Sequence, residues 1–285
     1  MEYRNPRPDE IDQMKRLWKV CFGDEDAYID FYYAHGYEAA NTFVAAEQER
    51  VVSMMTLLPV TMRTEQGSFR GRYVYAVATD PQHRGRGLMT ALEAYAARTV
   101  QAQGDAFLTL VPASMPLFGM YRKIGYHLFS SLSYQKLESG KRAGKALPTT
   151  VKPLDDAAFL EQRSRFLSQF SPSVSFAPTV QDYFLQELRF NGCQALALEN
   201  ARGSGYVLCY TEQGEAFIRE LSVSPACFAG ALSALRDYLS VKTMNLKASA
   251  DWQDNLLTRP YSMVKWLDRK PVGPSADSYM NLMLD

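Results

Sequence analysis

The residues best suited to chemistry lie in the stretch QHRGRGL, residues 82–88. A predicted strand ends just before it, and a predicted helix begins at its last residues. The first turn of a helix leaves backbone N–H groups without partners, and together with the helix dipole they attract anions. Gly85 and Gly87 have no Cβ, so a phosphate can approach the backbone closely. Arg84 and Arg86 add positive charge. The stretch is typical of a pyrophosphate-binding loop.

The residues alone leave other interpretations of this stretch open. It fits neither the GxxxxGK[ST] pattern of a Walker A loop nor the GxGxxG dinucleotide fingerprint. A glycine-rich turn that carries two solvated arginines would explain the same residues. The loop therefore predicts a phosphate-containing ligand only together with further motifs.

The elements that must position the loop follow from the hydrophobic pattern. Helical spacing of apolar residues predicts helices over residues 8–22, 24–34, 87–100 and 115–124. Alternating or continuous apolar runs predict strands over residues 2–4, 42–46, 51–60, 73–79, 106–111 and 126–136. This order, a meander followed by a βαβ unit, predicts an α/β (α+β) fold with a mixed sheet and helices on both faces.

The chain is expected to consist of two domains. Residues 139–150, SGKRAGKALPTT, have the composition of a linker. We therefore expect a first domain over residues 1–138 and a second over residues 151–285.

A short internal repeat relates the two halves. Residues 221–235, LSVSPACFAGALSAL, repeat the strand–proline–helix pattern of residues 77–92, VATDPQHRGRGLMTAL. The second copy has lost the arginines and keeps one glycine, Gly230, while Phe228 stands where charge would be needed. We expect this copy to be degenerate and to bind no phosphate.

Composition limits the classes of function. The chain has 31 basic and 31 acidic residues, and this balance disfavours nucleic acid as a main partner. Its four cysteines lack the spacing of a metal site, so we expect no metal. We find neither a signal-peptide pattern nor an apolar run of the ~18 residues that a membrane span needs. We therefore expect a cytoplasmic protein that does not bind membranes.

Two motifs together make the chain resemble the GNAT superfamily of N-acyltransferases. Q-x-x-G-x-G after a strand that ends V-A-T-D-P matches the acyl-CoA loop of that family. Residues 117–126, LFGMYRKIGY, resemble its F-Y-x-k-x-G-F helix and strand. Met120 stands where the family often has Phe, and Tyr126 replaces the final Phe. The resemblance covers about residues 1–138.

The whole chain is similar to the enhanced-intracellular-survival branch of this superfamily. In that branch a catalytic GNAT domain is followed by a degenerate GNAT copy and then by a sterol-carrier-like domain. We expect this third domain to be missing here, because the sequence ends soon after the strand around residues 261–268. In the longer relatives the final carboxylate reaches the active site, and the role of Asp285 stays open.

The resemblance implies acetyl-CoA as the acyl donor. The end of the strand before the loop would pair its backbone with the pantetheine arm, and one N–H there would bind the thioester oxygen as it becomes an oxyanion. The loop and the first helical turn would bind the pyrophosphate. The expected cofactor-binding residues are Val77, Ala78, Thr79, Arg84, Gly85, Arg86, Gly87, Leu88, Met89 and Thr90.

Tyr121, in the second motif, is the expected catalytic residue. In the family the matching tyrosine protonates the departing CoA thiolate. A thiol pKa of about 8.5 and a tyrosine pKa of about 10 make this transfer feasible as charge develops. The alternative is a tyrosine that only packs on the sheet beside Leu117 and Ile124.

The general base is not specified. The strand before the loop carries no carboxylate. Glu25, Asp26 and Glu38 lie near the region that borders the acceptor site in relatives, but solvated surface charges are the simpler interpretation. The aromatic residues at positions 28–33 are expected in the core rather than in an acceptor pocket.

The leading prediction is an acetyl-CoA-dependent N-acetyltransferase, in which a primary amine attacks the thioester directly in a ternary complex. Cys21 belongs to the first predicted helix, and no cysteine lies near the motifs in the sequence, which agrees with direct transfer. A non-catalytic acyl-CoA-binding or regulatory module is the alternative. The zero net charge disfavours a tRNA-dependent transferase. The acceptor, a small-molecule or peptide amine, and the oligomeric state are left open.

Overall fold

The computed structural model describes residues 1–138, 147–249, 257–268, 275 and 277–284. Its first half contains β1 (Glu2–Arg4), α1 (Ile11–Phe22), α2 (Asp26–His35), β2 (Thr42–Glu47), β3 (Arg50–Thr64), β4 (Gly67–Thr79), α3 (Leu88–Ala102), β5 (Phe107–Leu110), α4 (Met115–Lys123) and β6 (His127–Glu138). Its second half contains β7 (Thr150–Pro153), α5 (Asp156–Leu167), β8 (Ser173–Phe176), α6 (Pro178–Phe190), β9 (Gln194–Asn200), β10 (Gly203–Glu212), β11 (Glu215–Ser222), α7 (Phe228–Leu239), β12 (Thr243–Ser249), β13 (Leu257–Trp266) and β14 (Tyr279–Met280).

The order of elements expected for the first half is confirmed. The main difference is the length of the β3–β4 hairpin, whose strands extend beyond the expected 51–60 and 73–79. The extra part is stabilised from the second half, because β8 pairs with β3 from Val60 to Arg63. Long-range pairing of this kind leaves no signal in the local pattern.

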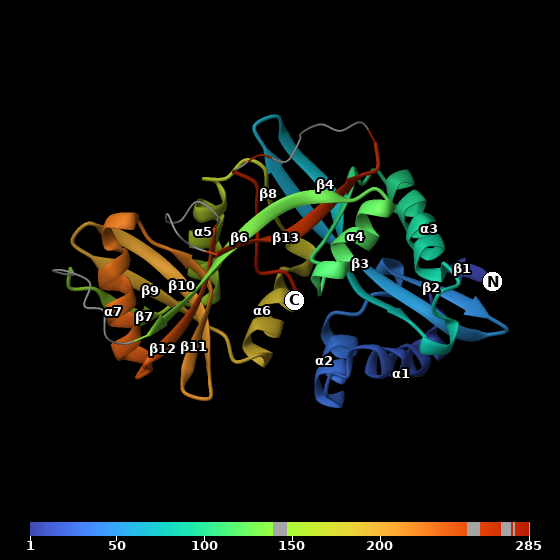
Figure 1. The fold of residues 1–285 in the computed structure, drawn as a ribbon, viewed down its shortest axis with the longest axis horizontal. Helices are drawn as coiled ribbons and strands as arrows, with labels where there is room; N and C mark the ends of the chain where they lie inside the picture. The colour runs from blue at the N-terminus through green and yellow to red at the C-terminus, as the bar shows by residue number, and fades with distance from the viewer. Residues whose placement is uncertain (139–146, 250–256, 269–274, 276, 285) are drawn as a thin grey trace.

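The strands of the described residues form one mixed sheet of 14 strands, with helices on both faces. In the first half, α1 and α2 pack on one face around Met14, Trp18 and Tyr32. On the other face, α3 and α4 pack around Leu92 and Tyr121. The expected mixed α/β fold is therefore confirmed (Figure 1).

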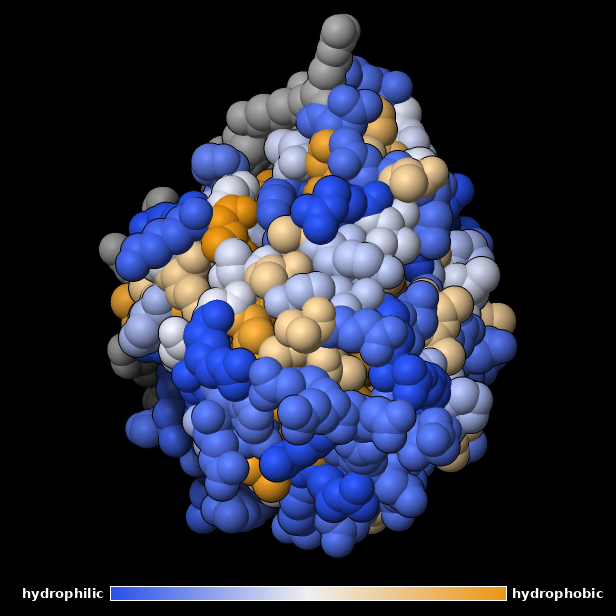
Figure 2. All heavy atoms as spheres, turned by 90° about the vertical axis from the view of Figure 1, so that its right-hand side faces the viewer, coloured by the Kyte–Doolittle hydropathy of each residue, from blue (hydrophilic) through white to orange (hydrophobic). Residues whose placement is uncertain are grey.

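One end of the molecule carries β1, β2 and α3. Figure 2 shows this end face, on which hydrophilic side chains predominate and hydrophobic ones form only small groups. No helix among the described residues is both long and apolar enough to cross a bilayer.

Strands β4 and β5 lie parallel but pair only over three residues, Gly71–Tyr73 with Phe107–Thr109. A buried ion pair fastens this junction, with the Arg72 Nε donating to Asp105 Oδ2 at 2.7 Å. Gly71 permits the close approach, since a Cβ there would lie 2.4 Å from the Phe107 ring. Beyond Tyr73, β4 has no partner on this side among the described residues, so its edge is open up to the turn that follows.

Strand β13 comes from the second half but lies between β5 and β6 in the sheet, antiparallel to both. Strand β6 in turn pairs with β12 over residues 132–138, and in Figure 1 it runs from one half to the other. The sheet is therefore continuous between the halves. The domain limits at 138 and 151 stay a prediction. Of the expected linker, residues 139–146 lie outside the described residues, as does Asp285.

Candidate active site

The open edge of β4 leads directly into the glycine-containing loop. A short 3-10 turn, Pro81–His83, follows the strand and is fixed by Asp80, whose side chain accepts a hydrogen bond from the Gln82 N–H at 2.9 Å. The chain then passes through Gly85 and Gly87, which have φ values of 76° and 73°. These left-handed conformations favour glycine, so both glycines are required by the course of the loop.

The first turn of α3 faces open space. The first intrahelical hydrogen bond runs from the Ala91 N–H to the Gly87 carbonyl, so the N–H groups of Leu88, Met89 and Thr90 precede the helical ladder. A Cβ placed on Gly85 or Gly87 would meet no atom within 4 Å. The Leu88 side chain is buried, so its contribution to a ligand would come from its backbone. The arrangement can hold an anionic group at the end of the helix.

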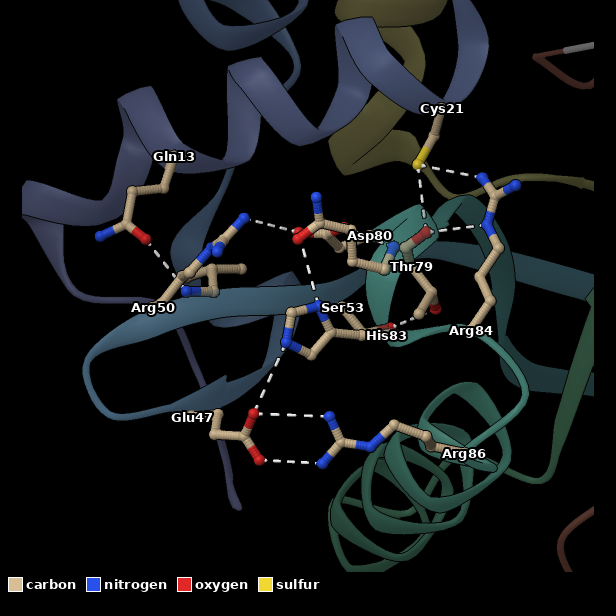
Figure 3. Close-up of polar contacts among 12 residues, drawn as sticks. Gln13, Cys21, Glu47, Arg50, Ser53, Thr79, Asp80, His83, Arg84 and Arg86 are labelled. Carbon is tan, nitrogen blue, oxygen red and sulfur yellow. Dashed lines mark hydrogen bonds and ion pairs between the residues drawn. The ribbon is translucent and has the colours of Figure 1, made fainter.

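The two arginines of the loop are held by neighbouring groups (Figure 3). The Arg84 Nε donates to the Thr79 carbonyl at 3.1 Å. The Arg86 Nη2 lies 2.9 Å from Glu47 Oε1, on the strand β2. This guanidinium holds the pKa of Glu47 below its usual value. Both arginines therefore stand at the loop as expected, but each has a protein partner that an anionic ligand would have to share or replace.

Cys21 lies at the loop, which corrects the expectation that no cysteine is near the motifs. Its Sγ is 3.4 Å from the Thr79 carbonyl oxygen and 3.6 Å from the Arg84 Nη2. The separation in sequence, 58 residues to Thr79, hid this contact. The α1 helix brings the thiol there because its apolar face packs across β3 and β4.

The backbone of β4 is irregular just before the loop. Thr56 pairs with Tyr75 and Met54 with Ala78, so one residue of β3 faces two residues of β4. Within this bulge, Ala76 has a φ of 50°. A left-handed conformation at a residue with a Cβ is uncommon and costs energy, and such conformations often mark functional sites. Bulges re-aim the groups next to them, here Val77 at the open edge.

The residues expected to bind the cofactor thus form one continuous path. Val77, Ala78 and Thr79 end the open strand, and the loop 84–87 and the first turn of α3 follow it directly. Two of the strand carbonyls already have partners, since Ala78 accepts from Ser53 and Thr79 from Arg84.

Tyr121 lies on the inner face of α4, 7% exposed. It belongs to the apolar cluster that Val77 also contacts, and its ring lies 5.4 Å from that of Tyr126. No hydrogen bond of its hydroxyl is found within the described part of the chain. Burial, with a smaller contribution from Glu93, raises its pKa to about 12. It is a weaker acid than the free side chain assumed from the sequence.

The carboxylates considered as general bases are not brought to this path. Glu25, Asp26 and Glu38 are exposed. Asp26 pairs with Lys19 at 3.1 Å, and Glu38 accepts a hydrogen bond from the Asn41 amide at 2.6 Å. Their placement fits solvated surface charges.

The aromatic residues of α2 pack as expected, and part of what they pack against belongs to the second half. Tyr32 is 1% exposed. The Phe31 ring lies 4.5 Å from that of Phe190 on α6. The Tyr28 hydroxyl is 2.8 Å from the Tyr75 hydroxyl on β4. The second half therefore covers the side of β4 opposite to α3 and α4.

Two features of this region were missed from the sequence. The Tyr73 hydroxyl donates to the Leu284 carbonyl at 3.3 Å, which brings the C-terminal segment to β4. Glu93 on α3 is 2% exposed and pairs with Lys265 of β13 at 2.8 Å. Glu93 could have been noticed in the sequence, because it lies beside the apolar stripe of a predicted helix. Nothing in the sequence marked Lys265 as its partner.

Metal binding is not indicated by side-chain clustering. Within the described residues, no three His, Cys, Asp or Glu side chains lie together as a metal site would need.

Comparison with known proteins supports one family. Residues 2–129 match the family model of the acetyltransferase (GNAT) domain, whereas no curated protein matches the sequence significantly. A GCN5-related N-acetyltransferase from Anabaena variabilis shares the fold with a TM-score of 0.78 and 16% identity, over 94% of this chain and 73% of that one.

Two further solved structures also match this chain over both halves. Eis1 from Mycobacterium abscessus has a TM-score of 0.66 and 14% identity, over 94% of this chain and 74% of the other. A tandem GNAT protein from the clavulanic acid biosynthesis pathway has a TM-score of 0.54 and 12% identity, over 94% and 99%. At these identities the likeness shows a common fold.

Proposed function

We propose that the chain, whose residues 2–129 match the family model of the acetyltransferase (GNAT) domain, is an acetyl-CoA-dependent N-acetyltransferase that acts on a primary amine. The observation that carries the proposal is the open edge of β4 running into an exposed helix N-terminus through two left-handed glycines. This path offers backbone donors along the length that an extended, phosphate-ended thioester would occupy.

The donor is bound in two parts. Its pyrophosphate lies against the N–H groups of residues 88–90 and the loop before them, where the helix dipole favours negative charge. Arg86 supports it once the ligand competes with Glu47, which is exposed and therefore only weakly held. The pantetheine arm lies along the unpaired edge of Val77–Thr79 as an added strand.

The reaction is a direct transfer. The amine nitrogen attacks the thioester carbonyl carbon, the C–S bond breaks with its electron pair leaving on the CoA thiolate, and the proton lost by the nitrogen passes to solvent, so that the products are the N-acetyl amide and CoA. A backbone N–H next to the bulge at Ala76 binds the carbonyl oxygen as it gains negative charge. Cys21 forms no covalent intermediate in this scheme, because its thiol lies beyond the strand end, at Thr79 and Arg84.

Tyr121 assists the leaving group. Its raised pKa of about 12 keeps the hydroxyl protonated at neutral pH and able to donate. The CoA thiolate has a conjugate pKa of about 8.5, so full proton transfer from Tyr121 is uphill. Its hydrogen bond therefore stabilises the thiolate as charge develops, and any charge that makes Tyr121 less acidic slows the reaction.

The acceptor reaches the thioester from the side of α2 and α6. The hydroxyls of Tyr28 and Tyr75 meet there, and the C-terminal segment contacts Tyr73. We also propose a cytoplasmic location, since the four cysteines are free thiols, as is usual in a reducing compartment.

The test is release of free thiol from acetyl-CoA across a panel of primary amines, with calorimetric binding of acetyl-CoA measured in parallel. We expect amine-dependent release, and a fall of about a hundredfold in kcat for Tyr121→Phe with unchanged binding. Binding without release for any amine would instead favour a non-catalytic acyl-CoA module.

A further inference from the structure

The helix that begins at the cofactor loop carries a buried carboxylate. Glu93 lies in the second turn of α3, and its side chain is 2% exposed. Both its oxygens have donors: Lys265 Nζ lies 2.8 Å from Oε1 and 2.9 Å from Oε2, and the Tyr126 hydroxyl donates to Oε1 at 3.0 Å. A buried charge without a partner is strongly destabilising, and here both oxygens of Glu93 are paired with Lys265.

The lysine comes from the other half of the chain. It lies near the end of β13, the strand inserted between β5 and β6, and it is 172 residues away from Glu93. Its side chain passes over Gly125, where a Cβ would lie 3.7 Å from the Lys265 Cε. Its Nζ ends 5.6 Å from the centre of the Tyr126 ring. Strand β13 thus places a cation between the sheet and the helices α3 and α4.

This ion pair lies close to Tyr121. The Tyr126 ring, which contacts both charges, packs edge-on against the Tyr121 ring at 5.4 Å and 67°. The Tyr126 N–H also donates to the Tyr121 carbonyl at 3.1 Å. The negative charge of Glu93 is one of the causes that raise the pKa of Tyr121. Burial is the larger cause of that shift, so the direct link between the ion pair and Tyr121 is the packing of the Tyr126 ring.

We propose that Lys265, supplied by the second half, is a positioning residue for acyl transfer: paired with Glu93, it fixes the Tyr126 ring that packs against Tyr121, and so holds Tyr121 where it can assist the departing thiolate. The inference rests on the proposed function, in which Tyr121 performs this step. It gives the second half a part in the chemistry of the first, although it contributes no atom that touches the substrate.

The test is a double-mutant cycle between Lys265 and Tyr121, measured with the amine that gives thiol release. We expect Lys265→Met to lower kcat about tenfold while the calorimetric affinity for acetyl-CoA stays unchanged. In the Tyr121→Phe background the same change should lower kcat no further. The control is Lys152→Met, which removes an exposed lysine that also lies 2.9 Å from a glutamate, and which should leave kcat unchanged.

A second variant covers the case in which Lys265→Met does not fold. Lys265→Met combined with Glu93→Gln contains no unpaired buried charge, and we expect it to fold and to recover most of kcat. Equal losses in both tyrosine backgrounds, weaker binding of acetyl-CoA, or a folded but slow double variant would each mean a merely structural role. If Tyr121→Phe itself leaves kcat unchanged, the proposed role of Tyr121 fails and this inference fails with it. If Tyr121→Phe slows the enzyme and Lys265→Met does not, only this inference is overturned.

Discussion

The two strand–turn–helix units of the chain, β4–α3 and β11–α7, follow the same course up to a proline and differ in the residues that lead into the helix. After Pro81 the first unit makes a 3-10 turn and then a separate loop through Gly85 and Gly87. In the second unit the 3-10 turn Pro225–Cys227 runs straight into α7. The second unit therefore lacks the loop that exposes backbone donors.

The surroundings of the two helix starts also differ. The glycines before α3 face open space. At the start of α7, Gly230 is covered, because a Cβ there would lie 2.5 Å from the Leu147 carbonyl oxygen. Phe228 is also buried. The expectation that the second copy is degenerate agrees with this packing.

The strands of the two units, β4 and β11, also differ in how far their edges are covered. Both carry a bulge, at Ala76 in β4 and at Arg219 in β11. Beside the first bulge the strand edge is open, whereas beside the second Glu220 is fully buried and bonded to Arg163, Tyr206 and Tyr279. The same unit thus leaves its backbone free in the first copy, where we propose the binding surface, and is covered by packing in the second.

The largest expected effect on acetyl-CoA binding comes from placing a negative charge in the first turn, and the same change in the second turn is the comparison. Gly85→Glu should weaken acetyl-CoA binding about a hundredfold, because like charges placed against each other cost several kcal/mol. The matched change Ala226→Glu, at the exposed turn of the second unit, should leave binding unchanged. Calorimetry on both variants measures this. Loss of binding in Ala226→Glu would show that the second unit also holds the cofactor.

The next effect breaks the buried pair in the second strand. Glu220→Leu leaves the Arg163 guanidinium buried without its carboxylate, and we expect a loss of about 3–5 kcal/mol in the free energy of unfolding. Denaturant titration measures it. The affinity for acetyl-CoA of the folded fraction should not change, and a selective loss of affinity would contradict a structural role for β11.

A glycine pair sharpens the contrast between the helix starts. Gly230→Ala should lower the free energy of unfolding by about 1–3 kcal/mol, because the new methyl group meets a backbone carbonyl. Gly85→Ala should cost about 1–2 kcal/mol, because a side chain at its positive φ is strained, yet weaken acetyl-CoA binding by crowding the phosphate. Thermal unfolding and calorimetry together test the pair. Unchanged acetyl-CoA affinity in Gly85→Ala would contradict a phosphate that lies against this glycine.

The smallest expected effect concerns Glu47, which pairs with Arg86 and would compete with the ligand for it. Glu47→Gln should tighten acetyl-CoA binding by up to about fivefold, since an exposed ion pair is worth about 0–1 kcal/mol. Glu49→Gln, in the same β2–β3 turn, is the control. Because Arg86 lowers the pKa of Glu47, the carboxylate stays charged in mildly acidic buffer, and lowering the pH to about 5 should not reproduce the gain. Weaker binding by Glu47→Gln would instead mean that Glu47 orients Arg86 for the ligand.

The sequence determined the features of this protein that depend on neighbouring residues. Apolar spacing predicted the elements of the first half in order, and the glycines predicted an open turn before α3. The repeated strand–proline–helix pattern predicted the second copy, and its loss of one glycine and of the arginines predicted that it is degenerate. Hydrophobic periodicity and left-handed turns are properties of a few adjacent residues, so they can be recognised without knowing the fold.

The tertiary structure alone decided which distant segments meet. It placed β13 between β5 and β6, Lys265 against Glu93, and the Cys21 thiol against Thr79. It also put Ala76 in a left-handed conformation, although alanine carries no signal for one. The partner of a strand or of a buried charge is chosen by the free energy of the whole packed chain, because burial penalises every polar group that finds no partner.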